Sequence, residues 1–454
     1  MMTSVKLSAL SECLNATLIN GDALIQGVST DTRNIHDGDL FIALKGERFD
    51  AHDFAAQAID SGAVALVVDH PIALPIPQLV VDDTRIALGL IGEYNRAFFT
   101  GTLIAVTGSS GKTTVKEMLA TILSGVGETL FTQGNLNNDI GVPLTLLRLS
   151  AEHRYAVIEM GASGPNEIAY SASLSHPDIA MVNNAMGAHL EGFGSLEGVV
   201  EAKGEIYDGL TNQGVAIVNV DDPYAQRWLD RAKGKSILTF GLAAGADVRA
   251  QALYLQTNGC YGFDLMYQNE SVAVRLNVLG RHNVCNALAA AAASLSAGLS
   301  LSQIASGLAK FSAVKGRMFS TQGVNGALVI DDSYNANPGS VCAAISMLSE
   351  LKGERALVLG DMGELGADEV SLHQEVGQFA AQMGIEKLFA VGRLSQFTVE
   401  AYKQAGGICA EHLGDKSELV SRLQHEAHSA MVILVKGSRS AAMDQVVNCL
   451  VGEA

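Results

Sequence analysis

Residues 103–114, LIAVTGSSGKTT, place a glycine-rich loop and a Lys-Thr pair directly after a short apolar run. The apolar run predicts a buried strand, and the pattern that follows Thr114 predicts an α-helix. Backbone N–H groups of such a loop, together with the positive end of the helix, bind anionic oxygens. Lys112 can reach the terminal phosphates of a nucleotide, and the hydroxyl of Thr113 can hold Mg²⁺. The stretch therefore predicts a site for a nucleoside triphosphate with Mg²⁺.

The loop departs from the general phosphate-binding pattern at one position, because Val106 stands where that pattern has its first glycine. Here the first glycine comes later, at Gly108. An ordinary strand-to-helix turn is the alternative, but such a turn rarely supplies Gly-Lys-Thr after a buried strand. We expect the nucleotide to be bound by Thr107, Gly108, Ser109, Ser110, Gly111, Lys112, Thr113 and Thr114.

Three further residues could act on the metal or the phosphates. Glu159 ends the apolar strand predicted for residues 154–160, and ligands of doubly wound sheets bind beyond the carboxyl ends of strands. We therefore expect Glu159 to provide a second contact to Mg²⁺, near Thr113. His189 follows the next predicted strand and is equally compatible with a structural role and a ligand role. Lys203, in the segment EAKGEI, indicates only a solvated helix face when its residue chemistry is taken alone.

Amide side chains are dense after the phosphate loop and recur near the start of a later helix. Asn135, Asn137 and Asn138 lie in a glycine-flanked loop, where they either cap a turn or recognise a polar substrate. Asn283 and Asn286 share one helix face and can hold a base or a ribose. Capping of the helix by Asn283 is the alternative.

Two polar clusters near the N-terminus could bind an anion. The first contains Ser29, Asp31 and Arg33, and the second contains Lys45 and Arg48. Residue chemistry alone favours two solvated loops over a ligand site in which these cations bind an anion.

Four polar clusters interrupt the last third of the chain, and all but the first follow a predicted strand. They are Lys315-Gly316-Arg317, DDSYNANP at residues 331–338, GDMGE at residues 360–364 and KGSR at residues 436–439. Singly, each cluster is compatible with a solvated loop. Together they indicate a site between this part of the chain and the phosphate-loop part, because ligand sites often form between domains.

The elements that would position these residues alternate between strand and helix along all 454 residues. We predict an α/β chain of three domains. These are a small N-terminal α/β domain for the substrate (residues 1–98), a central parallel-sheet domain with the phosphate loop (residues 99–313) and a C-terminal Rossmann-like domain (residues 314–454).

Composition excludes several classes of protein. The formal net charge of −18 argues against a general nucleic-acid or membrane-surface binder, which would need a basic face. Any anionic substrate must then be held by a few placed cations. No apolar run approaches the roughly 20 residues of a membrane span, and the N-terminus lacks a signal-peptide pattern. The six scattered cysteines fit a reducing cytoplasm, so we expect a cytoplasmic protein. We also expect it to be a monomer.

Taken in order, TGSSGKTT, the strand end at Glu159, His189, EAKGEI, RHNVCNALAA, KGR and DDSYNANP resemble the Mur ligases along the whole chain. These enzymes form amide bonds with ATP during peptidoglycan assembly. TQGNLNNDIGVPLTLL, LGDMGELG and VKGSR are similar to the family member that adds the final dipeptide. The resemblance implies UDP-N-acetylmuramoyl tripeptide and D-alanyl-D-alanine as substrates, and ATP with two Mg²⁺ ions as the nucleotide and metal.

The resemblance also implies individual roles. It makes Lys112, Lys203, His189 and Arg317 catalytic, and places Thr113, Glu159, His189 and Lys203 at the metal ions, with Lys203 carbamylated. It assigns further nucleotide contacts to Asn283, Asn286, Arg317, Asp332, Asn335 and Asn337. It assigns substrate contacts to Ser29, Asp31, Arg33, Lys45, Arg48, Asn135, Asn137, Asn138, Lys436, Ser438 and Arg439.

The implied chemistry passes through an acyl phosphate. The terminal carboxylate of the tripeptide attacks the γ-phosphorus of ATP, and the dipeptide amine then displaces phosphate. Cations must neutralise the approaching anions, and closure of the domains would exclude water. A sibling ligase, including a folylpolyglutamate-synthase-like enzyme, is the alternative with the same fold. A P-loop phosphotransferase or GTPase switch would need a guanine-reading motif, which we do not find, and a non-catalytic binding protein is the third alternative.

Overall fold

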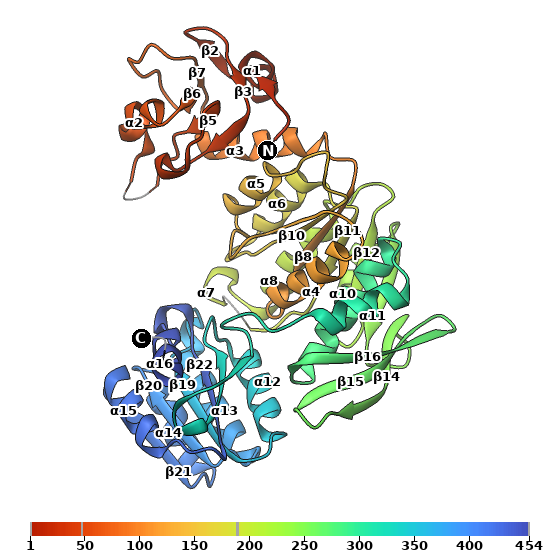
Figure 1. Cartoon of the computed structure of the whole chain (residues 1–454), viewed down its shortest axis with the longest axis vertical. Helices are drawn as coiled ribbons and strands as arrows, with labels where there is room; N and C mark the ends of the chain where they lie inside the picture. Colours follow the sequence, from red (N-terminus) through yellow and green to blue (C-terminus); the bar gives the residue numbers. More distant parts are fainter. Residues whose placement is uncertain (1, 47–48, 188–189, 453–454) are drawn as a thin grey trace.

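The computed structural model describes residues 2–46, 49–187 and 190–452. Figure 1 shows three α/β units in a row along the long axis of the molecule, with the N-terminal unit at one end. Each unit is built around a sheet of its own, of five, nine and six strands in chain order. The three-domain α/β organisation predicted from the sequence is thus confirmed, while the predicted boundaries at residues 98–99 and 313–314 stay predictions.

The N-terminal unit has a mixed sheet in the order β2-β7-β6-β5-β4, in which only the β2–β7 pair is antiparallel. A short antiparallel ribbon, β1–β3, lies beside it. Its strands are β1 (Val5–Lys6), β2 (Thr17–Ile19), β3 (Leu24–Ile25), β4 (Gly27–Ser29), β5 (Asp39–Ile42), β6 (Ala63–Val68) and β7 (Gln78–Val80). Its helices are α1 (Leu7–Leu14), α2 (Ala55–Asp60) and α3 (Thr84–Arg96), with the 3₁₀ turns η1 (Thr32–Asn34) and η2 (Ala51–Phe54).

The central sheet has the order β16-β15-β14-β13-β12-β11-β8-β10-β9. Strands β9 to β14 and β8 run parallel, and β15 and β16 extend the sheet as an antiparallel hairpin. The strands are β8 (Thr102–Thr107), β9 (Thr129–Phe131), β10 (Tyr155–Glu159), β11 (Ile179–Val182), β12 (Val215–Asn219), β13 (Ser236–Gly241), β14 (Val248–Leu255), β15 (Cys260–Tyr267) and β16 (Glu270–Leu279). The helices are α4 (Lys112–Ser124), α5 (Gly141–Leu146), α6 (Glu167–Ser175), α7 (Leu190–Phe193), α8 (Leu196–Gly204), α9 (Ala225–Arg231), α10 (His282–Ser296) and α11 (Leu301–Lys310), with η3 (Glu205–Tyr207).

Strand β8 shows why the central sheet forms. Its residues alternate between the two apolar cores that cover the sheet: Ile104 and Val106 pack in one, Leu103 and Ala105 in the other. Parallel strands that are covered on both faces read as continuous apolar runs, which is what the sequence predicted here. The phosphate loop follows at the carboxyl end of this strand, and α4 begins at Lys112.

The C-terminal sheet has the order β17-β18-β22-β19-β20-β21, and only β17 is antiparallel to its neighbour. Its strands are β17 (Phe319–Gln322), β18 (Leu328–Asp332), β19 (Glu354–Gly360), β20 (Lys387–Val391), β21 (Cys409–Leu413) and β22 (Met431–Lys436). Its helices are α12 (Pro338–Ser349), α13 (Glu369–Gln382), α14 (Ser395–Gln404), α15 (Lys416–Glu426) and α16 (Asp444–Val451), with η4 (Val324–Gly326), η5 (Gly366–Asp368) and η6 (Arg439–Ala441).

The β15–β16 hairpin joins the central unit to the C-terminal unit. Cys260 and Leu279, at its base, are buried in the same apolar cluster as the C-terminal helices. The hydroxyl of Tyr261 donates to Oε2 of Glu350, just beyond α12, over 2.8 Å. Apolar burial and one charged hydrogen bond therefore hold the two units together at this edge.

Two differences from the sequence predictions concern the sheets. The C-terminal unit was expected to be parallel, but β17 is an antiparallel edge strand, and β21 is a further edge strand that was not predicted. The β21 sequence CAEHL has only one fully buried residue, so it lacks the apolar run by which buried strands are found. In the part of the chain that is described, no helix is long and apolar enough to cross a membrane.

Candidate active site

A cavity of about 960 Å³ lies between the central and C-terminal units. Its walls are the loops at the carboxyl ends of β8, β10, β11, β12, β18, β19 and β22, together with the start of α10. Strand β8 lies between β10 and β11, so later strands of the chain lie on both sides of it. Open α/β sheets bind their ligands at the carboxyl end of such a position, where the strand order reverses. The site between two domains that the polar clusters predicted is therefore present.

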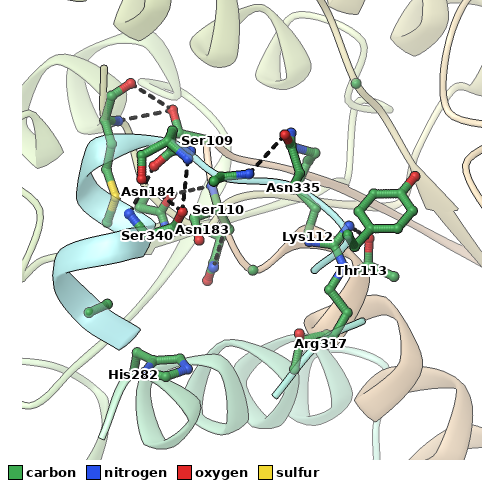
Figure 2. A pocket seen from close by; sticks show the side chains of 18 of the residues that line it. Ser109, Ser110, Lys112, Thr113, Asn183, Asn184, His282, Arg317, Asn335 and Ser340 are labelled. Carbon is green, nitrogen blue, oxygen red and sulfur yellow. Dashed lines mark hydrogen bonds between the residues drawn. The ribbon is translucent and has the colours of Figure 1, made fainter. Parts of the chain in front are cut away.

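The phosphate loop is held in place by the segment that follows β11. The Ser110 backbone N–H donates to Oδ1 of Asn184 over 2.9 Å, and that of Ser109 donates to the Asn184 carbonyl over 3.0 Å. The Ser109 hydroxyl donates to the carbonyl of Met186 (Figure 2). The N–H groups of Ser109 and Ser110 are therefore used inside the protein, whereas the first N–H groups of α4 remain available to phosphate. The sequence did not assign this role to Asn184.

Gly111 is a residue of the loop at which a side chain has no room. Its φ is +77°, in the region that favours glycine. A Cβ at this position would lie 2.5 Å from Oδ1 of Asn286 and 2.6 Å from Nδ2 of Asn183. The buried amides therefore pack directly on the turn from which α4 starts.

Lys112 and Arg317 bring positive charge from two different units to one end of the cavity. Nη2 of Arg317 donates to the Thr113 hydroxyl over 3.2 Å, and Nζ of Lys112 donates to the carbonyl of Gly108 over 2.7 Å. Desolvation lowers the pKa of Lys112, Glu159 opposes this effect, and Arg317 adds to it. At this end of the cavity two cations face one carboxylate, an arrangement that is suited to binding a phosphate group.

Glu159 is the carboxylate that faces them, and it is 2% exposed. Its Oε1 accepts from Nδ2 of Asn137 over 2.8 Å and from the Thr113 hydroxyl over 3.3 Å. Its backbone N–H donates to the hydroxyl of Thr132. Its Oε2 is buried and has no hydrogen-bond partner within the described residues. An orphaned carboxylate oxygen beside a threonine hydroxyl is the donor set that a hard divalent cation prefers, so these residues fit Mg²⁺.

Lys203, near the end of α8, is buried at 2% exposure and does not itself line the cavity. Desolvation and Lys112 lower its pKa to about 7, whereas Glu167 and Glu205 act in the opposite direction. Within the described residues its nitrogen has no hydrogen bond or ion pair, and it lies 5.5 Å from the ring centroid of Phe193. The solvated helix face suggested by residue chemistry alone is wrong. The predicted ligand His189 lies outside the described residues.

The amides expected at the adenine form a chain of hydrogen bonds at the cavity wall. Nδ2 of Asn183 donates to Asn286, Nδ2 of Asn286 donates to Asn283, and Nδ2 of Asn283 donates to the carbonyl of Leu279. His282 lies beside them, and desolvation lowers its pKa to about 4. Asn283 and Asn286 line this cavity and their amides orient each other, while their contact with a nucleotide stays a prediction.

Polar residues of the C-terminal unit line the opposite wall. Nζ of the buried Lys436 lies 2.5 Å from Oδ2 of Asp332 and donates to the carbonyl of Asn335 over 2.9 Å. The side-chain oxygen of Asn337 caps α12 by accepting from the N–H of Ser340, so that oxygen has a structural role. Ser438 and Arg439 also line this wall.

The predicted substrate residues fall into two groups. Asn135, Asn137 and Asn138 line the cavity, where Asn137 is bound to Glu159 and Oδ1 of Asn138 accepts from the N–H of Gly141. The predicted residues of the N-terminal unit that are described do not line the cavity: Ser29, Asp31, Arg33 and Lys45.

The described charged side chains of the two N-terminal clusters form ion pairs with nearby carboxylates. Arg33 binds the Asp31 carboxylate through Nε and Nη2, which lowers the pKa of Asp31 to about 2. Lys45 lies 3.8 Å from Asp50, and the predicted residue Arg48 lies outside the described residues. The structure thus does not bring the N-terminal residues together with the phosphate loop.

Three family profiles match the chain in order. They are the Mur ligase family catalytic domain at residues 24–94, the Mur ligase middle domain at residues 106–294 and the Mur ligase glutamate ligase domain at residues 316–439. The three profiles follow the N-terminal, central and C-terminal units of the structure in order. The chain belongs to the Mur ligases.

Individual relatives are similar along their whole length. The chain is 49% identical to the UDP-N-acetylmuramoyl-tripeptide–D-alanyl-D-alanine ligase of Escherichia coli (strain K12), over 99% of both chains. It is 35% identical to the ligase of the same name from Bacillus subtilis (strain 168), over 97% of both chains. Among solved structures, MurF from Acinetobacter baumannii is 39% identical with a TM-score of 0.92, covering 98% of both chains. MurF ligase from Thermotoga maritima, solved in complex with ADP, is 26% identical with a TM-score of 0.84, covering 93% of this chain and 96% of that one.

Substitution of Gly111 by alanine tests the phosphate loop. The added methyl group would require both a strained φ and displacement of Asn183 and Asn286, so we expect Gly111→Ala to weaken ADP binding at least about tenfold. Isothermal titration calorimetry measures this. Gly125→Ala, at the other end of α4 where φ is −71°, is the matched control and should bind ADP like the wild type. Equal affinity of the two variants would contradict the role given to Gly111.

Proposed function

We propose that the chain joins D-alanyl-D-alanine to UDP-N-acetylmuramoyl tripeptide in an ATP-dependent ligase reaction of peptidoglycan precursor synthesis. Identity of 49% over 99% of the chain with the Escherichia coli ligase of that name carries the proposal. The cavity supports it, because Lys112, Thr113, Glu159 and Arg317 converge in it from two units. A cytoplasmic location, which rests on the scattered cysteines, and a monomeric state are further proposals.

The reaction has two steps, and the two cations at the phosphate loop act in the first of them. The tripeptide carboxylate attacks the γ-phosphorus of ATP, the bond to the β-phosphate oxygen breaks, and ADP leaves. Lys112 and Arg317 offset the charge of the two approaching anions. The dipeptide amine then attacks the acyl carbon, phosphate takes the electron pair, and the amine loses a proton. A cavity between two units shields the acyl phosphate from water.

Thr113 and Glu159 would hold Mg²⁺, which supplies charge neutralisation at the phosphates. Lys203 would act as a carbamate: its neutral amine attacks CO₂ and loses a proton, which turns a buried cation into an anion. Burial of an amine without a partner in the described part of the chain, and its pKa of about 7, support this modification.

Acceptor specificity tests the proposed reaction. Phosphate release from ATP should require both the UDP-muramoyl tripeptide and D-alanyl-D-alanine, because the acyl phosphate forms only on the tripeptide and turns over only with an amine. A coupled assay with each substrate omitted in turn measures this. Turnover with L-glutamate or diaminopimelate in place of the dipeptide would instead identify a sibling ligase.

The metal assignment predicts a selective loss in Glu159→Gln. This variant keeps the hydrogen bond from Asn137 but loses the negative charge that faces Thr113. The gain in ADP affinity on adding Mg²⁺ should fall roughly tenfold or more, as for other disrupted metal sites. Calorimetry with and without Mg²⁺ measures the gain, and ADP alone provides the internal control. An unchanged gain would remove Glu159 from the metal site.

Carbamylation of Lys203 predicts a pH-dependent signal. Only the neutral amine reacts with CO₂, and a pKa of about 7 makes it a minor form near about pH 6 and the major form near about pH 8. At constant dissolved ¹³CO₂, a carbamate carbon resonance should therefore grow as pH rises. It should be absent from Lys203→Arg. Short carboxylic acids should restore part of the activity of Lys203→Ala, and a wild type without the resonance would contradict the proposal.

A further inference from the structure

Arg317 reaches the phosphate loop from the turn between α11 and β17, and an aromatic ring lies against it. Its guanidinium carbon is 4.1 Å from the ring centroid of Tyr334, inside the roughly 6 Å range of a cation–π contact. The same guanidinium donates to the Thr113 hydroxyl over 3.2 Å. Within the described residues no carboxylate forms an ion pair with it. Among the described residues, the contacts of this cation are therefore with the ring and one hydroxyl.

Backbone hydrogen bonds hold the segments that carry Arg317 and Tyr334 next to each other. The carbonyl of Gly316 accepts from the N–H of Tyr334 over 3.2 Å, and the N–H of Gly316 donates to Oδ2 of Asp331 over 2.7 Å. Oδ1 of Asp331, which is buried, accepts from the N–H and hydroxyl of Ser333. Gly316 has a φ of +79°, and a Cβ there would lie 3.1 Å from the Cβ of Tyr334. The turn that carries Arg317 and the loop that carries Tyr334 are thus one hydrogen-bonded unit.

Charge explains why the guanidinium needs such support. The positive charge of Arg317 lies close enough to Lys112 to lower the pKa of that lysine. The two cations therefore repel each other when no phosphate lies between them. Figure 2 shows Lys112, Thr113 and Arg317 gathered on one side of the cavity. A long arginine side chain loses much rotamer freedom when it is fixed in one position. An aromatic face attracts the guanidinium and so offsets that loss of entropy, while the positive charge remains. A carboxylate in the same place would neutralise the charge.

We propose that Tyr334 is a positioning residue, whose ring holds the Arg317 guanidinium where the terminal phosphate of the bound triphosphate lies. The inference rests on the proposed function, because it takes ATP as the ligand. It extends that function to selectivity for the triphosphate over the diphosphate, since ADP lacks the γ-phosphate that Arg317 would bind. The motif DDSYNANP thereby gains a role for its aromatic residue, in addition to those of its amides and carboxylates.

The test is the ratio of two dissociation constants, for ADP and for the non-hydrolysable analogue adenylyl imidodiphosphate, both with Mg²⁺. Tyr334→Leu should lower this preference for the triphosphate about fivefold to thirtyfold, while ADP affinity stays close to that of the wild type. Tyr334→Phe retains the ring and should keep the preference. In an Arg317→Gln background, Tyr334→Leu should have no additional effect. A preference unchanged by Tyr334→Leu, or additive effects of the two substitutions, would overturn the inference.

Fluorination separates the ring's electrostatics from its shape and does not depend on how well the leucine variant folds. Replacement of Tyr334 by phenylalanine and by trifluorophenylalanine changes the charge on the ring face at nearly constant size. The preference should fall with fluorination, which a merely structural role would not produce. Arg439 lies farther from the ring, at 5.7 Å, so Arg439→Gln should keep the preference; a loss as large as that of Arg317→Gln would overturn the assignment. Absence of triphosphate preference and of turnover in the wild type would instead contradict the proposed function.

Discussion

Two cations that lie close together at the phosphate loop are the constraint on which this site depends. The chain carries a formal net charge of −18, yet Lys112 and Arg317 converge in the cavity with Glu159 as the carboxylate that acts on Lys112. Such an arrangement costs free energy until an anion with several charges binds, because like charges repel strongly where water is scarce. A bound nucleotide would therefore complete the electrostatic balance of the site, and Arg317 brings the C-terminal unit into contact with the phosphate loop.

Neutral polar groups provide the remaining precision of the site. Buried amides support the turn before α4, and Asn137 and Thr132 fix Glu159 through a hydrogen bond to the side chain and one from the backbone. These groups add no charge, so they orient the loop and the carboxylate without changing the balance between cations and anions. Preorganisation of this kind is the main contribution that a protein can make to phosphoryl transfer.

The sequence predicted the site best where a functional residue directly follows an apolar strand. The apolar runs of β8 and β10 and the residues directly after them located the phosphate loop and Glu159, because buried parallel strands are continuous in sequence. Pairing between distant segments was not predictable in the same way. Asn137 was expected at a substrate and binds Glu159, and Lys203 looked solvated but is buried, since only the packed fold decides which polar groups lose water. The pairing of Arg33 with Asp31 likewise depends on the loop conformation.

The hairpin contact between the central and C-terminal units has a mechanical consequence. Two rigid bodies that share an apolar contact along one edge lose most of their freedom to translate, and retain mainly rotation about that edge. Cys260, Leu279 and the Tyr261–Glu350 bond form such an axis, away from the residues that line the cavity. A small rotation about this axis changes the distance between Arg317 and Thr113. The change is larger the farther this pair lies from the axis. A rotation of the two units about the β15–β16 hairpin would therefore change the width of the cavity between them.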